Sequence, residues 1–193
     1  MTINVKLKHY KGLALDTGTH FFGAPCLPNR FARRRFFKEE MFVGQINLKD
    51  LAPADGSEVF PKSGMLYFFY DIFEHNFTVL FSKSEGEVLK EDFNRNFDFG
   101  SFTTPLKAEF SVPSDATEEA EYGEKLLCPV PQMVKDAYPK YAEGYRCLAL
   151  FCPPHFDYFK KQFLLNVKNY SCALISEKNL AAKRFSAVET VNI

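Results

Sequence analysis

The alternation of apolar and polar side chains along the chain predicts mostly strands. In residues 106–112 every second side chain is apolar, which is typical of a strand with one buried and one hydrated face. Residues 76–81 alternate in the same way, whereas residues 65–70 are apolar on both faces and predict a central strand. Further strands are predicted at 41–48, 147–151, 163–167 and 172–175, and an edge strand at 2–8.

Helical signals are few and short. The capping-box pattern Asp115-Ala-Thr-Glu118 predicts a helix that extends to about Leu126. Pro131 fits the first turn of a helix that must end before Pro139. Two shorter helical turns are predicted after polar caps, at Asn47 or Asp50 and at Asn179.

The amino-acid composition agrees with a β-rich chain. Aromatic residues make up 16% of the chain, with 22 Phe and 9 Tyr, and such side chains favour pleated sheets. We therefore predict an α+β fold of mostly antiparallel sheet with a few short helices. The length of 193 residues suits a single domain, residues 1–193. An apolar strand, a polar cap and a Leu-Ala pair occur at both 45–52 and 174–181, which leaves open a division into two related sheet halves, about 1–112 and 125–193.

Charge and apolar content argue against several classes of protein. Basic and acidic side chains both number 24, although residues 1–50 carry 9 basic against 4 acidic side chains and residues 51–122 carry 5 against 14. The balanced total argues against a dedicated nucleic-acid binder. No apolar run approaches the ~20 residues of a membrane span, and the N-terminus lacks the apolar segment of a signal peptide. We therefore expect a cytoplasmic protein with no membrane span, in which five widely spaced cysteines stay reduced.

Four short segments of the chain stand out by their patterns of residues. They are Gly23-Ala-Pro-Cys-Leu-Pro28, Phe42-Val-Gly-Gln-Ile-Asn-Leu48 with Leu51-Ala-Pro53, Pro61-Lys-Ser-Gly-Met-Leu-Tyr-Phe-Phe-Tyr-Asp71, and Asn179-Leu-Ala-Ala-Lys-Arg-Phe-Ser186. In this order they resemble the YwqG-like proteins, a bacterial domain family of unknown function. The absence of Trp and the short second half are typical of a divergent, short member. The resemblance implies antiparallel strands with small helices, and it implies neither a reaction nor catalytic residues.

Cysteine and histidine spacing raises one metal-site hypothesis. Cys147, Cys152 and His155 form a C-x4-C-x2-H pattern, and Cys128 or Cys172 would complete a four-ligand zinc site. In a strand, however, residues five apart point to opposite faces of the sheet. We therefore predict buried thiols, no metal and no cofactor.

Motifs of known enzymes are missing from the chain. It contains no G-x-S-x-G nucleophile elbow, no G-x-G-x-x-G and no Walker-type phosphate loop. Asp71, Glu74 and His75 follow a predicted strand, where they form either an acid–base cluster or a solvated turn. We predict no catalytic residue and keep Asp71 as a binding candidate.

Interleaved arginine and phenylalanine residues form one candidate nucleic-acid site. Arg33, Arg34 and Arg35 precede two Phe residues, and this pattern can bind phosphates and stack bases. Glu39 and Glu40 follow directly, and the acidic middle of the chain would repel a polyanion. A nucleic-acid partner is therefore not expected, and the three arginines remain candidates for binding another ligand.

Polar residues in a predicted apolar strand complete the candidates. Gln45 and Asn47 form hydrogen bonds with a ligand or partner, or they cap the turn that follows. Together these observations favour a non-catalytic binding module for a protein partner or a small ligand. The candidate binding residues are Gln45, Asn47, Asp71, Arg33, Arg34 and Arg35. The alternative is an enzyme, a hydrolase or transferase with a Cys–His or carboxylate site assembled by the fold.

Overall fold

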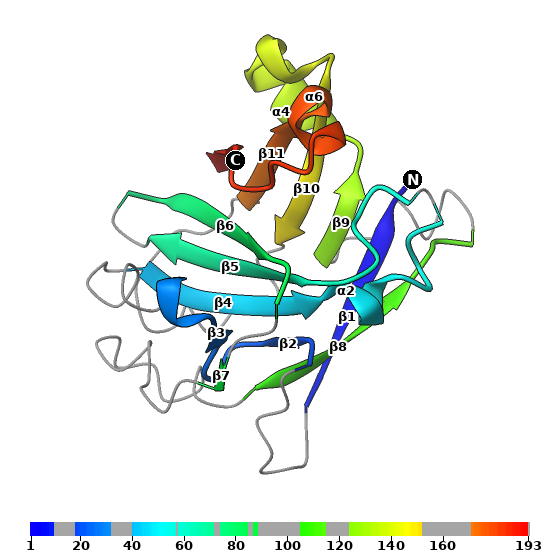
Figure 1. The fold of residues 1–193 in the computed structure, drawn as a ribbon. Helices are drawn as coiled ribbons and strands as arrows, with labels where there is room; N and C mark the ends of the chain where they lie inside the picture. Colours follow the sequence, from blue (N-terminus) through cyan, green and yellow to red (C-terminus); the bar gives the residue numbers. More distant parts are fainter. Residues whose placement is uncertain are drawn as a thin grey trace. The chain divides into compact units, whose positions relative to one another are not determined.

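The computed structural model describes most of the chain as two compact units (Figure 1). The described residues are 1–9, 18–31, 40–56, 58–71, 74–84, 87–88, 105–114, 124–151 and 171–192. Unit 1 comprises Met1–Lys6 and Phe110–Ile193, and unit 2 comprises Leu7–Glu109. Strands β1 (Ile3–His9) and β8 (Leu106–Ser111) each begin in one unit and end in the other.

Unit 2 is built around three long antiparallel strands. The strands β4 (Glu40–Asn47), β5 (Met65–Asp71) and β6 (Asn76–Ser82) are neighbours in that order, so β5 is central, as its two apolar faces predicted. The short strand β2 (His20–Phe21) lies between β4 and β8. A separate pair is formed by β3 (Cys26–Leu27) and β7 (Glu87–Val88). The core of this unit includes Leu27, Phe42, Met65, Tyr67 and Phe69.

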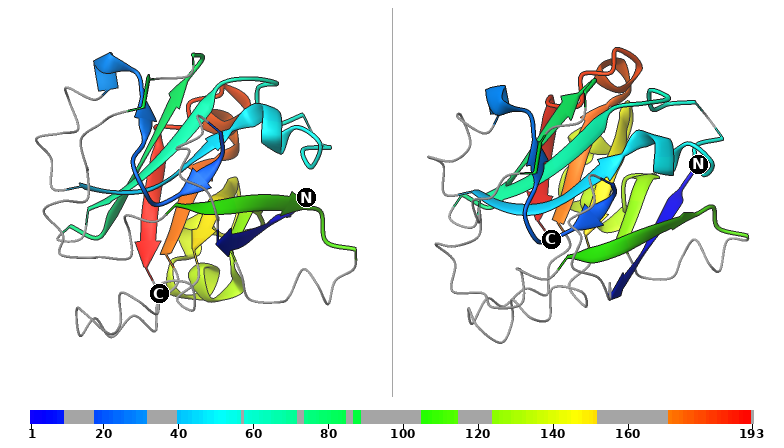
Figure 2. Two further views of the ribbon diagram at one scale, coloured as in Figure 1. Left: turned by 90° about the horizontal axis from the view of Figure 1, so that it is seen from below. Right: turned by 60° about the horizontal axis from the view of Figure 1, so that its bottom comes forward.

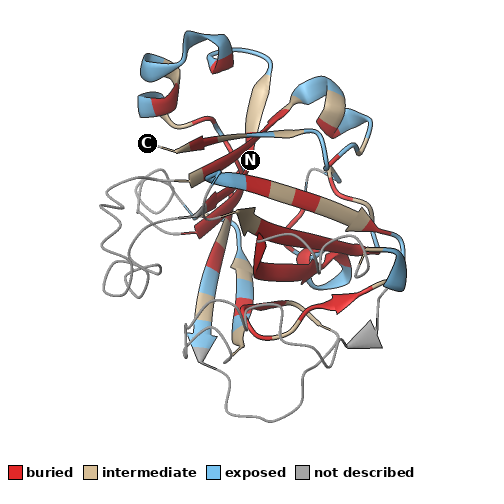
Figure 3. Ribbon diagram, turned by 90° about the vertical axis from the view of Figure 1, so that its left-hand side faces the viewer, coloured by how far each residue is buried: buried red, intermediate tan, exposed pale blue. Residues whose placement is uncertain are grey.

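Every residue of β4 is buried, the polar Glu40, Gln45 and Asn47 as well as the apolar ones. The pairing of β4 with β5 shifts register between Phe42 and Gly44. Gly44 has no side chain because the ring of Phe21 occupies that space. A Cβ added at Gly44 would lie 2.8 Å from Cδ1 of Phe21, too close for any other residue without a shift of the ring. Figure 3 shows how strongly the buried residues concentrate in the strands.

Unit 1 contains a second antiparallel arrangement, with strand order β12-β11-β10-β9-β1. Its strands are β9 (Glu124–Cys128), β10 (Tyr145–Phe151), β11 (Ser171–Ser176) and β12 (Val188–Asn192). Its helices are α4 (Gln132–Ala137), the 3-10 helix η1 (Pro139–Tyr141) and α6 (Glu177–Ala181). Figure 2 shows β10 and β11 side by side, in yellow and orange. The core of this unit includes Cys128, Val134, Tyr141, Cys147, Cys172 and Leu174.

The prediction of a β-rich, mostly antiparallel fold with a few short helices is confirmed. No helix in the described ranges is long and apolar enough to cross a membrane. The helix predicted between Pro131 and Pro139 is present as α4, whose N-terminal cap position is Pro131 itself. The strand predicted at 163–167 lies outside the described residues.

Two local predictions are wrong because pairing with distant strands decided them. Residues 124–126, predicted as the end of a helix, belong to β9 and pair with β1 and β10. The strand predicted at the edge, β1, has β9 and β8 as neighbours. Local helical preference contributes less to the free energy of folding than burial between two neighbouring strands does. The remainder of the predicted helix, residues 115–123, lies outside the described residues.

Both units contain a similar junction between a strand and a short helix. In unit 2, Leu48 begins α2 (Leu48–Leu51) and donates its N–H to the carbonyl of Gly64; in unit 1, Glu177 donates to Gly144, at 2.9 Å in each case. Both glycines have positive φ, +118° and +71°. At Gly64 a Cβ would lie 2.6 Å from the carbonyl oxygen of Ser82, so the junction requires glycine there. The order along the chain differs between the two junctions. Gly64 comes after α2 and directly before β5, whereas Gly144 comes before β10, and therefore before β11 and α6.

The helix caps give a first testable prediction. The Ser176 hydroxyl accepts a hydrogen bond from the backbone N–H of Asn179 at 3.3 Å, so Ser176 caps α6, and not Asn179 as the sequence pattern predicted. We expect Ser176→Ala to lower the free energy of unfolding by about 1 kcal/mol. Asn179→Ala, within the same helix, should change it by less than ~0.5 kcal/mol. Urea denaturation followed by circular dichroism compares the variants, and equal losses in both would contradict the assignment of the cap.

Candidate functional site

Gln45 is fully buried in β4 and connects two segments of unit 2. Its side-chain Nε2 donates to the carbonyl oxygen of Gly18 at 2.9 Å, and its Oε1 accepts from the backbone N–H of Cys26 at 2.8 Å. The hydroxyl of Tyr67 on β5 donates to the carbonyl oxygen of Cys26 at 2.7 Å. Both backbone groups of Cys26 are therefore held by side chains from neighbouring strands. The ring of His20 adds contacts with the carbonyl oxygens of Gly18 and Ala24, both at 3.2 Å.

These hydrogen bonds bring together three segments that carry the family resemblance. Cys26 belongs to the first, residues 23–28, whereas Gln45 and Tyr67 belong to the second and third. Burying an amide or a hydroxyl costs free energy unless the group is hydrogen-bonded. Here the amide of Gln45 and the hydroxyl of Tyr67 both form hydrogen bonds with the backbone of Cys26, in the first segment. The polar residues of the three segments thus have a structural use, which is to hold residues 18–28 against β4 and β5.

Asn47 ends β4 and caps α2. Its Oδ1 accepts from the backbone N–H of Lys49 at 3.1 Å, and its own backbone N–H donates to Oγ1 of Thr19 at 2.9 Å. The carboxylate of Asp50 accepts from both the backbone N–H and the hydroxyl of Thr19, at 3.2 and 2.7 Å. Of the two caps that the sequence allowed, Asn47 is the one in use.

The remaining sequence candidates lie elsewhere. Asp71 is at the far end of β5, where its Oδ1 accepts from the backbone N–H of Glu74 at 2.9 Å in the turn to β6. In the same turn, Nδ1 of His75 lies 3.3 Å from the hydroxyl of Tyr70. The three arginines, residues 33–35, lie outside the described part of the chain. The structure therefore brings Gln45 and Asn47 into one network and places Asp71 apart from them; whether any of them binds a ligand stays a prediction.

A different group of residues, part exposed and part buried, forms a hydrogen-bonded cluster on unit 1. The carboxylate of Glu189 on β12 accepts hydrogen bonds from the hydroxyl of Tyr141 at 2.7 Å, the hydroxyl of Tyr145 at 2.9 Å and Nζ of Lys140 at 3.1 Å. These donors lower the pKa of Glu189, Tyr141 contributing most. Burial raises the pKa of Tyr141, and the hydrogen bond to Glu189 raises that of Tyr145. Glu189 therefore stays ionised and both hydroxyls stay protonated donors at neutral pH.

Aromatic contacts order the same cluster. The rings of Tyr141 and Tyr145 meet edge to face with centroids 5.0 Å apart, and the ring of Tyr138 lies 6.3 Å from that of Tyr141. Nζ of Lys140 sits 4.5 Å from the centroid of the Tyr141 ring. We call the group of Met133, Tyr138, Lys140, Tyr141, Tyr145 and Glu189 the tyrosine surface.

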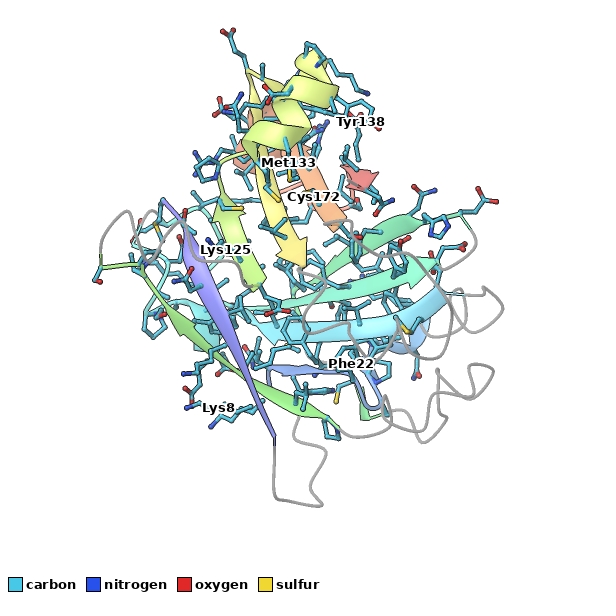
Figure 4. The ribbon with its side chains drawn as sticks, turned by 180° about the vertical axis from the view of Figure 1, so that it is seen from behind. Lys8, Phe22, Lys125, Met133, Tyr138 and Cys172 are labelled. Atoms are coloured by element: carbon cyan, nitrogen blue, oxygen red, sulfur yellow. The ribbon has the colours of Figure 1, made fainter. Side chains whose placement is uncertain are left out.

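Two members of the tyrosine surface are large apolar side chains that stay in water. Met133 is 43% exposed and Tyr138 is 44% exposed, and both come from α4 and the residue after it (Figure 4). Among the described residues the other exposed large apolar side chains are Met1 and Val112. The 3- and 4-residue spacing of the three tyrosines is visible in the sequence, but the partner Glu189 is 44 or more residues away. Sequence reasoning therefore missed this cluster.

The described thiols are buried in the cores of the two units and not at this surface. Within the described ranges, no three His, Cys, Asp or Glu side chains are placed to hold a metal ion. Cys152 and His155, which the zinc hypothesis needs, lie outside those ranges.

One buried carboxyl group stands apart from both clusters. Glu124 begins β9 and is only 2% exposed. Burial raises the pKa of Glu124 to about 7, because its charged form loses hydration there. The group therefore titrates near neutral pH, so that the stability of the fold depends on its protonation there.

The fold and this geometry define a β-rich, antiparallel protein with a partly exposed cluster of tyrosines and a structural network of buried polar groups. The family model of a domain of unknown function, DUF1963, matches residues 19–146 of the 193. The chain therefore belongs to this family. No curated protein matches the chain. The match includes the segments around Cys26, Gln45 and Tyr67 and ends within the tyrosine surface, before Glu189.

Proposed function

We propose that this protein is a non-catalytic binding module of the YwqG-like type, which acts in the cytoplasm and binds a protein partner through the tyrosine surface of unit 1. The exposure of Met133 and Tyr138 is the observation that carries the proposal. Tyr and Met are enriched at protein interfaces, where their large side chains exclude water from the contact. A Met and a Tyr that remain in water contribute little to folding.

The surroundings of these two residues favour a protein as the partner. Tyr141, Tyr145, Lys140 and Glu189 fix one another by hydrogen bonds and ring contacts, so little side-chain entropy is lost when a partner docks. The tyrosine surface combines exposed apolar side chains with charged ones, as protein interfaces do. The ionised Glu189 and the cation of Lys140 offer both signs of charge for matching a partner.

The placement of the four thiols in the described part of the chain supports binding over nucleophilic catalysis. The cysteines with shifted pKa, Cys128 and Cys147, are core residues of unit 1. A catalytic thiol has to meet its substrate and is usually partly exposed in a cleft. We therefore place the enzyme hypothesis second.

A capture experiment tests the proposal. The full chain, carrying a tag, is incubated with native cell lysate, and the captured proteins are quantified by mass spectrometry. We expect a near-stoichiometric protein partner, and we expect Met133→Ser combined with Tyr138→Ser to weaken its binding more than ~10-fold, as loss of interface anchors does. The affinity is then measured by calorimetry with the purified partner.

Val112→Ser is the matched control, because Val112 is also exposed, on unit 1, but outside the tyrosine surface. It should leave capture and affinity unchanged. Circular dichroism should show that all three substitutions leave the fold intact, since the side chains are in water. A partner that binds the double variant as tightly as the original chain would overturn the assignment of this surface.

A further inference from the structure

Three buried thiols from three neighbouring strands meet in the core of unit 1. Cys128 lies on β9, Cys147 on β10 and Cys172 on β11, and all three belong to one apolar cluster. Cys147 interacts with both Cys128 and Cys172, and its Sγ donates a hydrogen bond to the carbonyl oxygen of Ala149 at 3.2 Å. Figure 4 labels Cys172 among the side chains beneath α4. All three are free thiols.

Strand register distinguishes the two thiol pairs. Cys128 is directly opposite Cys147 in the antiparallel pair β9–β10, and directly opposite residues have Cα atoms about 4.5–5.5 Å apart. A disulfide needs Cα atoms about 4.4–6.8 Å apart, so this pair meets the requirement. Cys172 is opposite Leu150, not Cys147, and such a diagonal neighbour lies about 7–8 Å away. The backbone therefore favours a Cys128–Cys147 bond over a Cys147–Cys172 bond.

The chemistry of the three thiols is also unequal. Cys128 keeps 4% of its surface exposed, whereas Cys147 and Cys172 have none. A hydrogen bond from Cys147, with smaller contributions from the positive charges of Lys125 and Arg146, lowers the pKa of Cys128. The same contact raises the pKa of Cys147, which therefore keeps its proton. The thiolate is the nucleophilic form, and Cys128 is the one of the three with any exposed surface, so a molecule as small as a peroxide reacts first at Cys128.

We propose that Cys128 and Cys147 form an oxidisable dithiol, a modification site that a peroxide converts into a disulfide between β9 and β10. The Cys128 sulfur attacks one peroxide oxygen; the S–O bond forms, the O–O bond breaks, and the leaving oxygen departs as water or alcohol with the thiol proton. The Cys147 sulfur then attacks the sulfenic acid of Cys128; the S–S bond forms, and the hydroxyl leaves with the Cys147 proton as water. In total, two thiols are oxidised and one peroxide is reduced.

The bond would close a loop over residues 128–147. This loop contains α4 and η1, and with them Met133, Tyr138 and Lys140. A disulfide across the base of a loop restricts the conformations of the chain within it. An effect of oxidation on partner binding rests on the proposed function, whereas the oxidation itself does not.

Peptide mapping of the reduced, folded chain tests the proposal. The protein is treated with hydrogen peroxide, remaining thiols are alkylated under denaturing conditions, and tryptic peptides are analysed by mass spectrometry. Cys147 and Cys152 fall in one tryptic peptide, so the Cys152→Ser variant is used throughout. We expect a cross-link between the peptides of Cys128 and Cys147, with loss of both thiols from alkylation, while Cys26 and Cys172 stay alkylated.

Two further variants identify the thiols that form the cross-link. In the Cys152→Ser background, Cys172→Ser should leave the cross-link in place, and Cys128→Ser should abolish it without a new link from Cys147. If Cys128→Ser does not fold, the proposal is still tested by the Cys172→Ser variant and by the pair of peptides that is found cross-linked. A dominant Cys147–Cys172 link, a link that forms only in denaturant, or oxidation of Cys128 that stops at sulfinic acid would overturn the proposal. None of these readouts depends on a partner, so the proposed function can fail separately.

Discussion

Replacing Gln45 by Met is expected to lower the free energy of unfolding by about 2–5 kcal/mol. Met has a similar volume but no amide, so the substitution removes the hydrogen bonds with Gly18 and Cys26 and leaves buried backbone groups without this partner. A backbone donor or acceptor that loses its partner in the interior costs about 1–3 kcal/mol. Hydrogen exchange should show the loss locally, as reduced protection of residues 18–28.

Gln132→Met is the matched control for this experiment. Gln132 is exposed on α4 and its side chain donates to Asp136 at 2.7 Å, so the same chemical change occurs in water. We expect it to change the stability by less than ~0.5 kcal/mol. If Gln45 serves to bind a ligand and not to hold the fold, Gln45→Met will be as stable as the original chain, and the structural assignment will be wrong.

Replacing Glu124 by Gln is expected to stabilise the protein above neutral pH. The pKa of Glu124 is raised from 4.5 to about 7 by burial, so the folded state keeps a proton that the unfolded state has released. The original chain therefore loses stability as the pH rises from about 4.5 to 7, by about 3 kcal/mol in total at 1.36 kcal/mol per pH unit. Gln is neutral at every pH and avoids this loss.

The sign of the effect makes this prediction specific. At pH 4 the Glu124→Gln variant and the original chain should have nearly equal free energies of unfolding, and at pH 8 the variant should be more stable by about 3 kcal/mol. Urea denaturation at both pH values measures the difference. Glu143→Gln, at an exposed position, is the control and should change stability by less than ~0.5 kcal/mol at either pH. A Glu124→Gln variant that is destabilised equally at both pH values would show that Glu124 has a different role.

Apolar periodicity was sufficient to locate most strands of this chain. The segments now seen as β4, β5, β6, β8, β10 and β11 were predicted close to their observed bounds, because alternation or continuous apolarity reports directly which faces of a strand are buried. Pro131 and Pro139 bounded α4 correctly for an equally local reason, since proline restricts its own backbone and that of the residue before it.

The errors arose where distant strands compete with local preference. The capping-box pattern predicted a helix into residues 124–126, but these residues gain more by pairing between β1 and β10. Ser176 caps α6 in place of Asn179 because the helix begins directly after β11, at the junction with Gly144. Where a strand ends depends on its neighbours, and those neighbours are not encoded in the local pattern.

The candidate site could be predicted only in part. Gln45 and Asn47 stood out as polar residues in an apolar strand, and their partners turned out to be Gly18, Cys26 and Lys49. The sequence pattern showed that these two side chains need hydrogen bonds, but it did not show which groups are their partners. The tyrosine surface was missed, because the carboxylate that organises it comes from β12, far along the chain from η1.

By itself the sequence determined the class of fold, the central position of β5 and the need for hydrogen bonds at Gln45 and Asn47, because periodicity and the cost of burying polar groups act within a few residues. Only the tertiary structure decided that Glu189 meets Tyr141 and Tyr145, that Cys128 faces Cys147, and that Glu124 is buried. Each of these depends on which strands become neighbours. That choice is made by the burial of whole faces and by chain closure over tens of residues, and no local pattern records it.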